Sequence, residues 1–266
     1  MANSPSGESV ISRAMRVIDA FGAEDALLGV SEIAERADLP LATTHRIVAE
    51  LVAERVLERD SHRKVRMGTR LWEISQRASR EMDLRMAALP VMEDLQSLVR
   101  SHVQLAVISG GQVLYLERLS RRNAVINLAD RASRIPPYLC SAGLILLAYA
   151  PREIQAKAAE GPFISRTPNS IRTGDQLRAV IAASRQQGYA VSYGLMQPTA
   201  KGVAVPLFGE AGRIVAALSV VIPLEADHLP IVPAMQAASR MISHGLEAHQ
   251  VREDDVWHAP GAEPSR

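Results

Sequence analysis

The chain has 266 residues, of which 47% are hydrophobic and 22% charged, and its formal net charge is +1. This length fits two domains, and the composition is that of an ordinary globular protein rather than a disordered one. No apolar stretch is long enough to cross a membrane, and the N-terminus lacks the pattern of a signal peptide, so we expect a cytoplasmic protein. A single cysteine, Cys140, excludes a disulfide framework and a multi-thiolate metal site.

Two short helices are predicted first. Ser31 is expected to cap a helix that runs to Ala37, with Glu32 in the first turn, where the helix dipole favours a carboxylate. Pro40 closes the connecting turn and suits the start of a second helix over 41–55. Apolar spacing predicts one buried stripe on this second helix, formed by Ile47, Val48, Leu51 and Val52. The pair is typical of a helix-turn-helix, whose second helix enters the major groove of DNA.

A short β-hairpin is predicted next, because residues 56–59 and 64–67 alternate in polarity around a polar turn. Residues 1–80 contain equal numbers of basic and acidic residues, but 59–70 has five basic residues against one acidic residue, which suits contact with phosphates. We therefore expect a winged helix-turn-helix over 1–68 that binds double-stranded operator DNA. Base edges would be contacted by Thr43 and Arg46, the backbone or the helix packing by Thr44 and His45, and phosphates by Arg63 and Lys64.

The remaining chain is predicted to form a linker helix and a second domain. Residues 69–86 contain no glycine or proline and suit a connector helix, a dimer contact or packing on the wing domain. Pro90 is expected to begin a separate helix over 91–100. Within 87–250, strands are expected at 102–108, 112–119, 125–128, 189–192, 202–208 and 213–222, and helices at 144–149, 151–159, 174–187 and 231–249. The whole is an α+β chain with an antiparallel sheet in the second domain. Residues 251–266 are expected to be disordered.

Several segments resemble IclR-type transcriptional regulators. In the first domain these are SVISRAMRVIDAF at 9–21, SEIAER at 31–36, LP at 39–40 and TTHR at 43–46. In the second they are IPPY at 135–138, SAG at 141–143, LLA at 146–148, GY at 188–189, GVAVP at 202–206 and AALS at 216–219. The resemblance covers 9–248 and lies in the order and spacing of the motifs more than in any one of them.

The resemblance implies a GAF-like effector-binding domain, a homodimer that pairs into a tetramer, and a small organic effector, often an acid, that changes operator binding. No cofactor or metal is expected. Carried over by motif position, the effector pocket is lined by Asn127, Ser141, Ala142, Ser192, Ala200, Gly202, Ser219 and Val221. Free N–H groups at a helix N-terminus suit a carboxylate, and serine hydroxyls orient it. The alternative is that Ser141 is only a helix cap and Ser219 only a strand residue.

The sequence also departs from the family pattern. Asp38 stands where the turn usually has glycine, which aspartate tolerates because it visits the left-handed region. Ala42 replaces a frequent serine, and the lysine common near Leu144 is missing. The stretch 192–196, SYGLM, replaces a segment that is usually acidic. With the nearby apolar residues Tyr138, Leu139 and Met196, this favours an effector with an aromatic or otherwise apolar body.

Two other functions stay open. An enzyme would use Cys140, at a helix start, as its nucleophile, but no matching base is evident. His244 and His249 are five residues apart and do not share a helix face as a metal-binding pair would. A constitutive DNA-binding protein would use its second domain only to oligomerise. The sequence identifies neither the effector nor the operator. It also does not show whether the protein represses or activates transcription.

Overall fold

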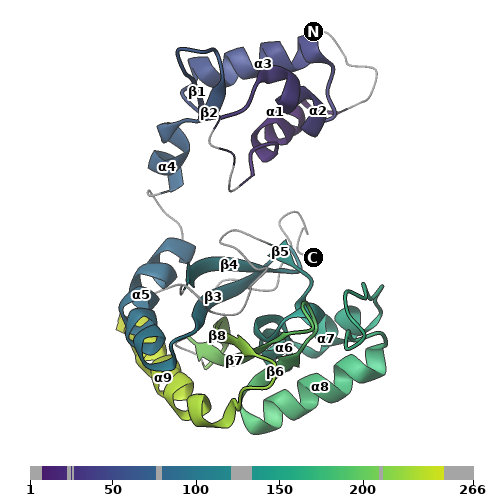
Figure 1. Cartoon of the computed structure of the whole chain (residues 1–266), viewed down its shortest axis with the longest axis vertical. Helices are drawn as coiled ribbons and strands as arrows, with labels where there is room; N and C mark the ends of the chain where they lie inside the picture. The colour runs from purple at the N-terminus through teal and green to yellow at the C-terminus, as the bar shows by residue number, and fades with distance from the viewer. Residues whose placement is uncertain are drawn as a thin grey trace, which may run out of the picture. The chain divides into compact units, whose positions relative to one another are not determined.

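The computed structural model describes residues 8–22, 25, 27–75, 80–120, 134–209 and 212–248. The chain divides into two compact units, residues 1–79 and 80–266, and the division falls within the stretch expected to be the linker. The helices and strands of each unit are labelled in Figure 1. Among the described residues, none of the helices combines the length and the apolar character that crossing a membrane requires.

The N-terminal unit is a small helical domain with a β-hairpin. Its elements are α1 (Val10–Asp19), α2 (Val30–Arg36), α3 (Leu41–Ala53), β1 (Leu57–Arg59), β2 (Val65–Met67) and α4 (Thr69–Ser75). Residues from the first three helices and both strands share one apolar core that includes Val17, Ile33, Ile47, Val48, Leu57 and Val65. Leu28 exchanges two backbone hydrogen bonds with Val65, of 2.9 and 2.8 Å, and so adds a bridging segment to the hairpin. The expected winged helix-turn-helix is confirmed.

The expected cap of α2 is wrong. The helix begins at Val30, before Ser31, and its N-cap is Gly29. The Gly29 N–H donates to the Glu32 carboxylate at 2.6 Å, which satisfies one of the amides that a helix start leaves open. Val30 is buried in the core, and this burial favours a helix that includes it.

The turn between α2 and α3 is held from a third helix. Asp38 has a left-handed backbone with φ of 49°, as expected for a turn position that often needs glycine. Arg16 on α1 donates from Nε to the Ala37 carbonyl at 2.8 Å and from Nη2 to the Asp38 carbonyl at 2.5 Å. Backbone carbonyls at the end of α2 therefore find partners, and the turn is fixed relative to α1.

The structure differs from the expected linker and from the helix expected after it. α4 ends at Ser75, and α5 (Arg80–Val99) belongs to the second unit. Pro90 does not begin a helix but lies inside α5, so the separate helix expected over 91–100 is wrong. Proline removes one backbone donor, yet the buried stripe of α5 continues at helical spacing on both sides of it, through Leu84, Ala88, Met92 and Leu95. Burial of this stripe keeps the helix in one piece.

A six-stranded antiparallel sheet forms the centre of the second unit, in the order β5-β4-β3-β8-β7-β6. The strands are β3 (His102–Ser109), β4 (Gln112–Leu119), β5 (Arg134–Ile135), β6 (Ala190–Tyr193), β7 (Ala200–Phe208) and β8 (Ile214–Pro223). The hairpin between β3 and β4 turns at Gly110 and Gly111, whose φ angles of 60° and 74° glycine adopts readily. The strand expected over 125–128 lies outside the described residues.

Helices cover both faces of this sheet, as Figure 1 shows. On one face lie α6 (Ser141–Tyr149), α7 (Arg152–Ala159) and α8 (Gly174–Gln187), and on the other lie α5 and α9 (Val232–Ala248); short 3-10 turns occupy η1 (Pro137–Leu139) and η2 (Leu229–Ile231). Side chains alternate along a strand, so β7 contributes Ala204 to the α6 core and Val203 and Val205 to the α5–α9 core. The expected α+β class is confirmed.

Candidate functional site

The exposed face of α3 presents three of the six residues expected to contact DNA. His45 and Arg46 are exposed, and Thr43 is half-buried. Arg46 makes only a loose ion pair with Glu50, at 3.7 Å, and its side chain is 60% exposed, so it is available to a partner. Thr44 is different, because it is fully buried and its hydroxyl donates to the Pro40 carbonyl at 3.2 Å. From the sequence, Thr44 has two possible roles, contact with the DNA backbone or helix packing. Its burial fits helix packing.

The wing offers fewer available cations than its sequence suggests. The Arg66 guanidinium pairs with Glu58 at 2.8 Å, and Arg70 pairs with Glu54 at 2.9 Å. Both carboxylates come before the basic stretch in the sequence, but in the fold they pair with arginines within it. In the part of the chain that the structure describes, the stretch 59–70 keeps three basic side chains without an acidic partner, namely Arg59, Arg63 and Lys64. Asp60 accepts the N–H groups of His62 and Lys64 and so shapes the tip of the wing.

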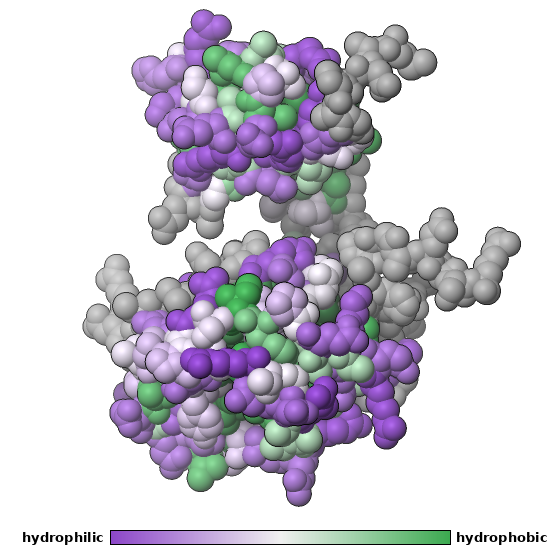
Figure 2. Space-filling view, turned by 90° about the vertical axis from the view of Figure 1, so that its right-hand side faces the viewer, coloured by the Kyte–Doolittle hydropathy of each residue, from purple (hydrophilic) through white to green (hydrophobic). Residues whose placement is uncertain are grey.

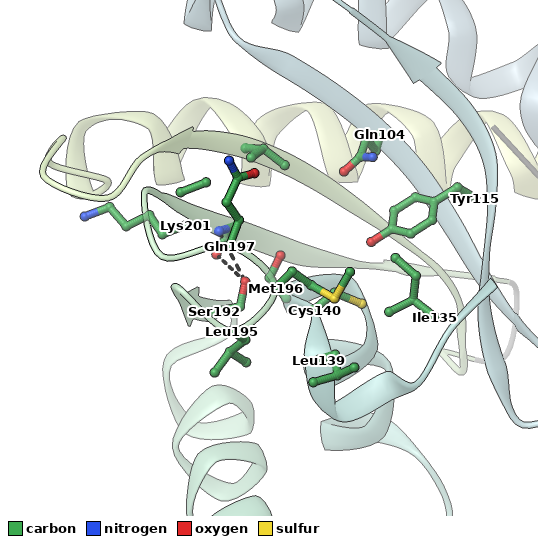
Figure 3. A pocket seen from close by; sticks show the side chains of 14 residues that line it. Gln104, Tyr115, Ile135, Leu139, Cys140, Ser192, Leu195, Met196, Gln197 and Lys201 are labelled. Atoms are coloured by element: carbon green, nitrogen blue, oxygen red, sulfur yellow. Dashed lines mark hydrogen bonds between the residues drawn. The ribbon is translucent and has the colours of Figure 1, made fainter. Parts of the chain in front are cut away.

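A cavity opens in the second unit between the sheet and the start of α6 (Figure 3). Its empty space of about 480 Å³ includes solvent that is open at its mouth. Its lining comes from β3 to β8: Gln104, Tyr115, Ile135, Leu139, Cys140, Ser141, Ser192, Leu195, Met196, Gln197, Ala200, Lys201, Gly202 and Val221.

Five of the residues expected in the effector pocket are brought together there: Ser141, Ser192, Ala200, Gly202 and Val221. Two others are buried beside it without lining it. Ala142 is fully buried behind the start of α6, and Ser219 lies on β8 with a buried hydroxyl that has no partner among the described residues. Asn127 lies outside the described residues.

Gly202 allows two hydroxyl groups to converge on one wall of this cavity. A Cβ atom at this position would lie 2.5 Å from Ser141 Oγ and 2.8 Å from Ser192 Oγ, both closer than van der Waals contact allows. The Gly202 N–H donates to Ser192 Oγ at 3.2 Å. The two serines come from α6 and β6, so the absence of a side chain on β7 is what lets them meet.

The start of α6 supplies backbone donors next to these hydroxyls. Cys140 is its N-cap, and the Leu144 N–H is the first to bond in the helical pattern, to the Cys140 carbonyl at 3.0 Å. Gly143 permits a close approach of η1, because a Cβ atom there would lie 2.2 Å from the Pro137 carbonyl oxygen. The first N–H groups of a helix attract an anion through their hydrogen-bonding capacity and the helix dipole. This wall can therefore bind a carboxylate without a buried cation.

The sequence reasoning missed several lining residues. Gln104 is 1% exposed and Tyr115 3% exposed, and they lie on β3 and β4. A glutamine inside the apolar run of 102–108 was the available signal. Lys201 also lines the cavity, but its amino group lies 5.4 Å from the centre of the Tyr193 ring and points away from Tyr115 and Cys140 in Figure 3.

Cys140 has the surroundings of an unreactive thiol. Burial raises the pKa of this thiol above its usual value, and hydrogen bonds from Tyr115 and the Gly143 N–H oppose that rise only in part. Burial, and then the neighbouring Cys140, raise the pKa of the Tyr115 hydroxyl well above its ordinary value. Among the described residues, the lining includes no histidine to act as a base, and none of the groups of His, Cys, Asp and Glu is arranged to hold a metal. Nucleophilic chemistry at Cys140 thus finds no support in this geometry.

Apolar side chains are exposed in the N-terminal unit. Ile11 and Met15 on α1 are 76% and 49% exposed, and Trp72 and Ile74 on α4 are 66% and 50% exposed. Figure 2 shows hydrophobic residues on one face of this unit, surrounded by hydrophilic ones. Such groups of exposed apolar residues commonly mark a contact with another protein chain.

A winged helix-turn-helix and a second unit with a cavity between its sheet and α6 define the class of effector-binding transcriptional regulators. Residues 10–61 match the family model of the IclR helix-turn-helix domain. Residues 76–244 match the model of the C-terminal domain of bacterial IclR transcriptional regulators. The chain belongs to the IclR family.

Relatives with known structures or names agree with this assignment. The chain is 40% identical to an IclR homologue from Microbacterium hydrocarbonoxydans whose crystal structure contains 4-hydroxybenzoate; the match covers 90% of this chain and 100% of that one, with a TM-score of 0.86. It is 29% identical to the regulator KipR of Bacillus subtilis (strain 168), over 73% of this chain and 78% of KipR. It is 24% identical to the Pca regulon regulatory protein of Pseudomonas putida, over 89% and 83% of the two chains.

Proposed function

We propose that this protein controls a catabolic operon by binding operator DNA and that it senses a small aromatic acid in the cavity of its second unit. The observation that carries the proposal is the wall formed by Ser141, Ser192 and Gly202 at the N-terminus of α6. It offers hydroxyl and backbone donors for a carboxylate, and part of the remaining lining is apolar.

The aromatic body of the effector is supported by two independent observations. Leu139, Leu195 and Met196 form an apolar part of the cavity lining next to the polar wall. The relative from Microbacterium hydrocarbonoxydans, at 40% identity over nearly the whole chain, holds 4-hydroxybenzoate in its crystal structure. A flat ring with one carboxylate suits a lining that is polar on one side and apolar beside it.

On the DNA, Arg46 would read a base and Thr43 would assist it, whereas Arg63 and Lys64 would hold phosphates. His45 would lie near the backbone. Thr44, being buried, is withdrawn from the proposed contacts. The DNA-binding region would comprise residues 1–68, and residues 87–250 would bind the effector and oligomerise.

The protein would act as a homodimer, and two dimers would pair. The exposed apolar residues of α1 and α4 support a contact between copies, and two copies would read paired half-sites. We expect it to work in the cytoplasm and to return its effector unchanged. An enzyme would consume the acid, and a constitutive DNA-binding protein would ignore it.

The test is a fluorescence anisotropy titration of the full-length protein against DNA from upstream of its own gene, with and without a panel of aliphatic and aromatic acids. We expect tight binding to one sequence and a change in its affinity with an aromatic acid, which is recovered intact afterwards. Scrambled DNA is the control. Specific binding that no acid alters would contradict the sensor, and loss of the acid by turnover would favour the enzyme.

A further inference from the structure

The cavity has a second polar side, away from its apolar end. Figure 3 places Gln104 and Gln197 at one end of the view and Leu139 and Leu195 at the other, with Ser192 and Cys140 between them. An unsubstituted apolar ring would need no hydrogen-bonding groups beyond those that hold its carboxylate. The two glutamines therefore indicate that the effector carries a further polar group.

Gln197 stands out by its side-chain amide oxygen. The residue lies between β6 and β7, where its backbone carbonyl accepts the Ala200 N–H at 3.2 Å. Its side-chain Oε1 is buried and has no hydrogen-bond partner in the described part of the chain. Most buried polar atoms in proteins are paired, and one that is unpaired at the wall of a cavity indicates a ligand or water that completes it.

A second unsatisfied atom lies on the neighbouring strand. Ser219 Oγ on β8 is buried and, within the described residues, also lacks a partner. Ser219 is opposite Gln104 in the pairing of β8 with β3. It is also two residues from Val221, which lines the cavity, so the two side chains share one face of the strand. Gln104, in contrast, already has an interaction within the protein.

We infer that Gln197 determines specificity by bonding a second polar group on the effector, and that this group is a hydroxyl on the ring. A hydroxyl both donates and accepts, so it satisfies whichever atom of the amide faces the cavity. The effector class is then a hydroxy-substituted aromatic acid, with its carboxylate at the start of α6. This inference rests on the proposed function, because it presupposes that an aromatic acid binds here.

The energetic reason is an asymmetry in binding. An acid that lacks the hydroxyl would displace water from the Gln197 amide without replacing its hydrogen bond, whereas the hydroxylated acid replaces it. Sites built to bond a ligand group reject analogues that lack that group more strongly than apolar sites reject extra bulk. Discrimination between the two acids should therefore depend on Gln197.

The experiment compares the dissociation constants of benzoate and the three monohydroxybenzoates for the wild-type protein, Gln197→Leu and Gln186→Leu by isothermal titration calorimetry. For the wild type we expect at least one hydroxybenzoate to bind about 10-fold tighter than benzoate. In Gln197→Leu this ratio should fall to within about 2-fold, because benzoate no longer leaves an amide unpaired and the hydroxybenzoate loses its hydrogen bond. Gln186→Leu, which is exposed on α8 and outside the cavity lining, is the control and should keep the wild-type ratio. Circular dichroism checks the fold, and Gln197→Met replaces Gln197→Leu if the latter does not fold.

Two results would overturn the inference while leaving the proposed function intact. One is equal binding of benzoate and all hydroxybenzoates by the wild type. The other is a loss in Gln197→Leu that is the same for both kinds of acid, which would place Gln197 at the carboxylate or in the structure of the wall. Failure of every aromatic acid to bind the wild type would overturn the proposed function and the inference together.

Discussion

The two functional regions of this chain are built in opposite ways. The DNA-binding surface lies on α3 and the wing, which are neighbours in the sequence, and its residues are exposed side chains. The cavity of the second unit draws its lining from residues 104 to 221, and most of them are buried. A surface of exposed charges tolerates substitution one residue at a time. A cavity assembled by close packing does not, so the same small change should have unequal effects in the two regions.

The largest effect is expected from Gly143→Ala. The added methyl group would meet the backbone of Pro137 at distances as short as 2.2 Å, and a backbone cannot rotate away as a side chain can. Overpacking of this kind costs about 1–3 kcal/mol or more and would shift the start of α6. We expect a lower thermal midpoint and loss of effector binding, measured by calorimetry.

The matched control is Gly245→Ala in α9, where nothing lies within 4 Å of the added carbon. Alanine favours a helix over glycine by up to about 1 kcal/mol, so this variant should be neutral or slightly more stable. If Gly143→Ala behaved like Gly245→Ala, the close packing at the pocket would not matter for its function.

Arg46→Ala should have the next largest effect, confined to DNA. We expect it to weaken binding to the true operator by about 1–3 kcal/mol and to leave binding to random DNA and the thermal midpoint nearly unchanged, because its guanidinium is exposed and would read a base. Anisotropy titrations against operator and scrambled DNA measure both losses. Equal losses on the two DNAs would remove Arg46 from base reading.

Lys64→Ala should act more weakly and without regard to sequence. Lys64 is exposed at the tip of the wing, where a single phosphate contact contributes about one unit to the slope of log affinity against log salt. Operator and scrambled DNA should lose affinity together, and the salt slope should fall by about that amount. A larger loss of affinity for operator than for scrambled DNA would contradict a phosphate contact and would assign base reading to the wing.

The smallest effect is a pH dependence in the wing. Hydrogen bonds from Arg66, and next from the Thr69 N–H, hold the pKa of the Glu58 carboxyl below its ordinary value of 4.5. A lowered folded-state pKa stabilises the fold above the ordinary value, and that contribution is lost as the pH falls through the folded-state pKa. The urea midpoints of wild type and Glu58→Gln should therefore differ slightly at neutral pH and converge below pH 4.5. A difference that grew on acidification would contradict the ion pair.

Local signals explain why much of the fold could be predicted from the sequence. The helix expected over 174–187 has these bounds: the Thr173 hydroxyl accepts the Gln176 N–H at 3.2 Å at its start, and Gly188 follows its end with φ of 77°. The helix expected over 231–249 is α9, and its apolar residues Met235, Ala238, Ile242 and Leu246 are buried at helical spacing. These features depend on residues a few positions apart, where backbone chemistry leaves few alternatives.

Tertiary contacts explain where the predictions were wrong or incomplete. Pro90 remains inside α5 because burial of a continuous stripe outweighs one lost hydrogen bond. Glu58 and Glu54 neutralise Arg66 and Arg70 from outside the counted stretch. Gln104 and Tyr115 reach the cavity only because β3 and β4 pair beside β8. Such partners are distant in sequence, and their positions follow only from the folded structure.

The most direct test of the central claim is thermodynamic reciprocity. We would measure the dissociation constant of the aromatic acid by calorimetry with the protein alone and with the protein saturated by operator DNA. If the acid and the operator bind one coupled system, the factor by which the acid changes operator affinity must equal the factor by which the operator changes acid affinity. We expect equal factors, in the same direction. An acid affinity that is unaltered by the operator would show that the cavity does not control DNA binding.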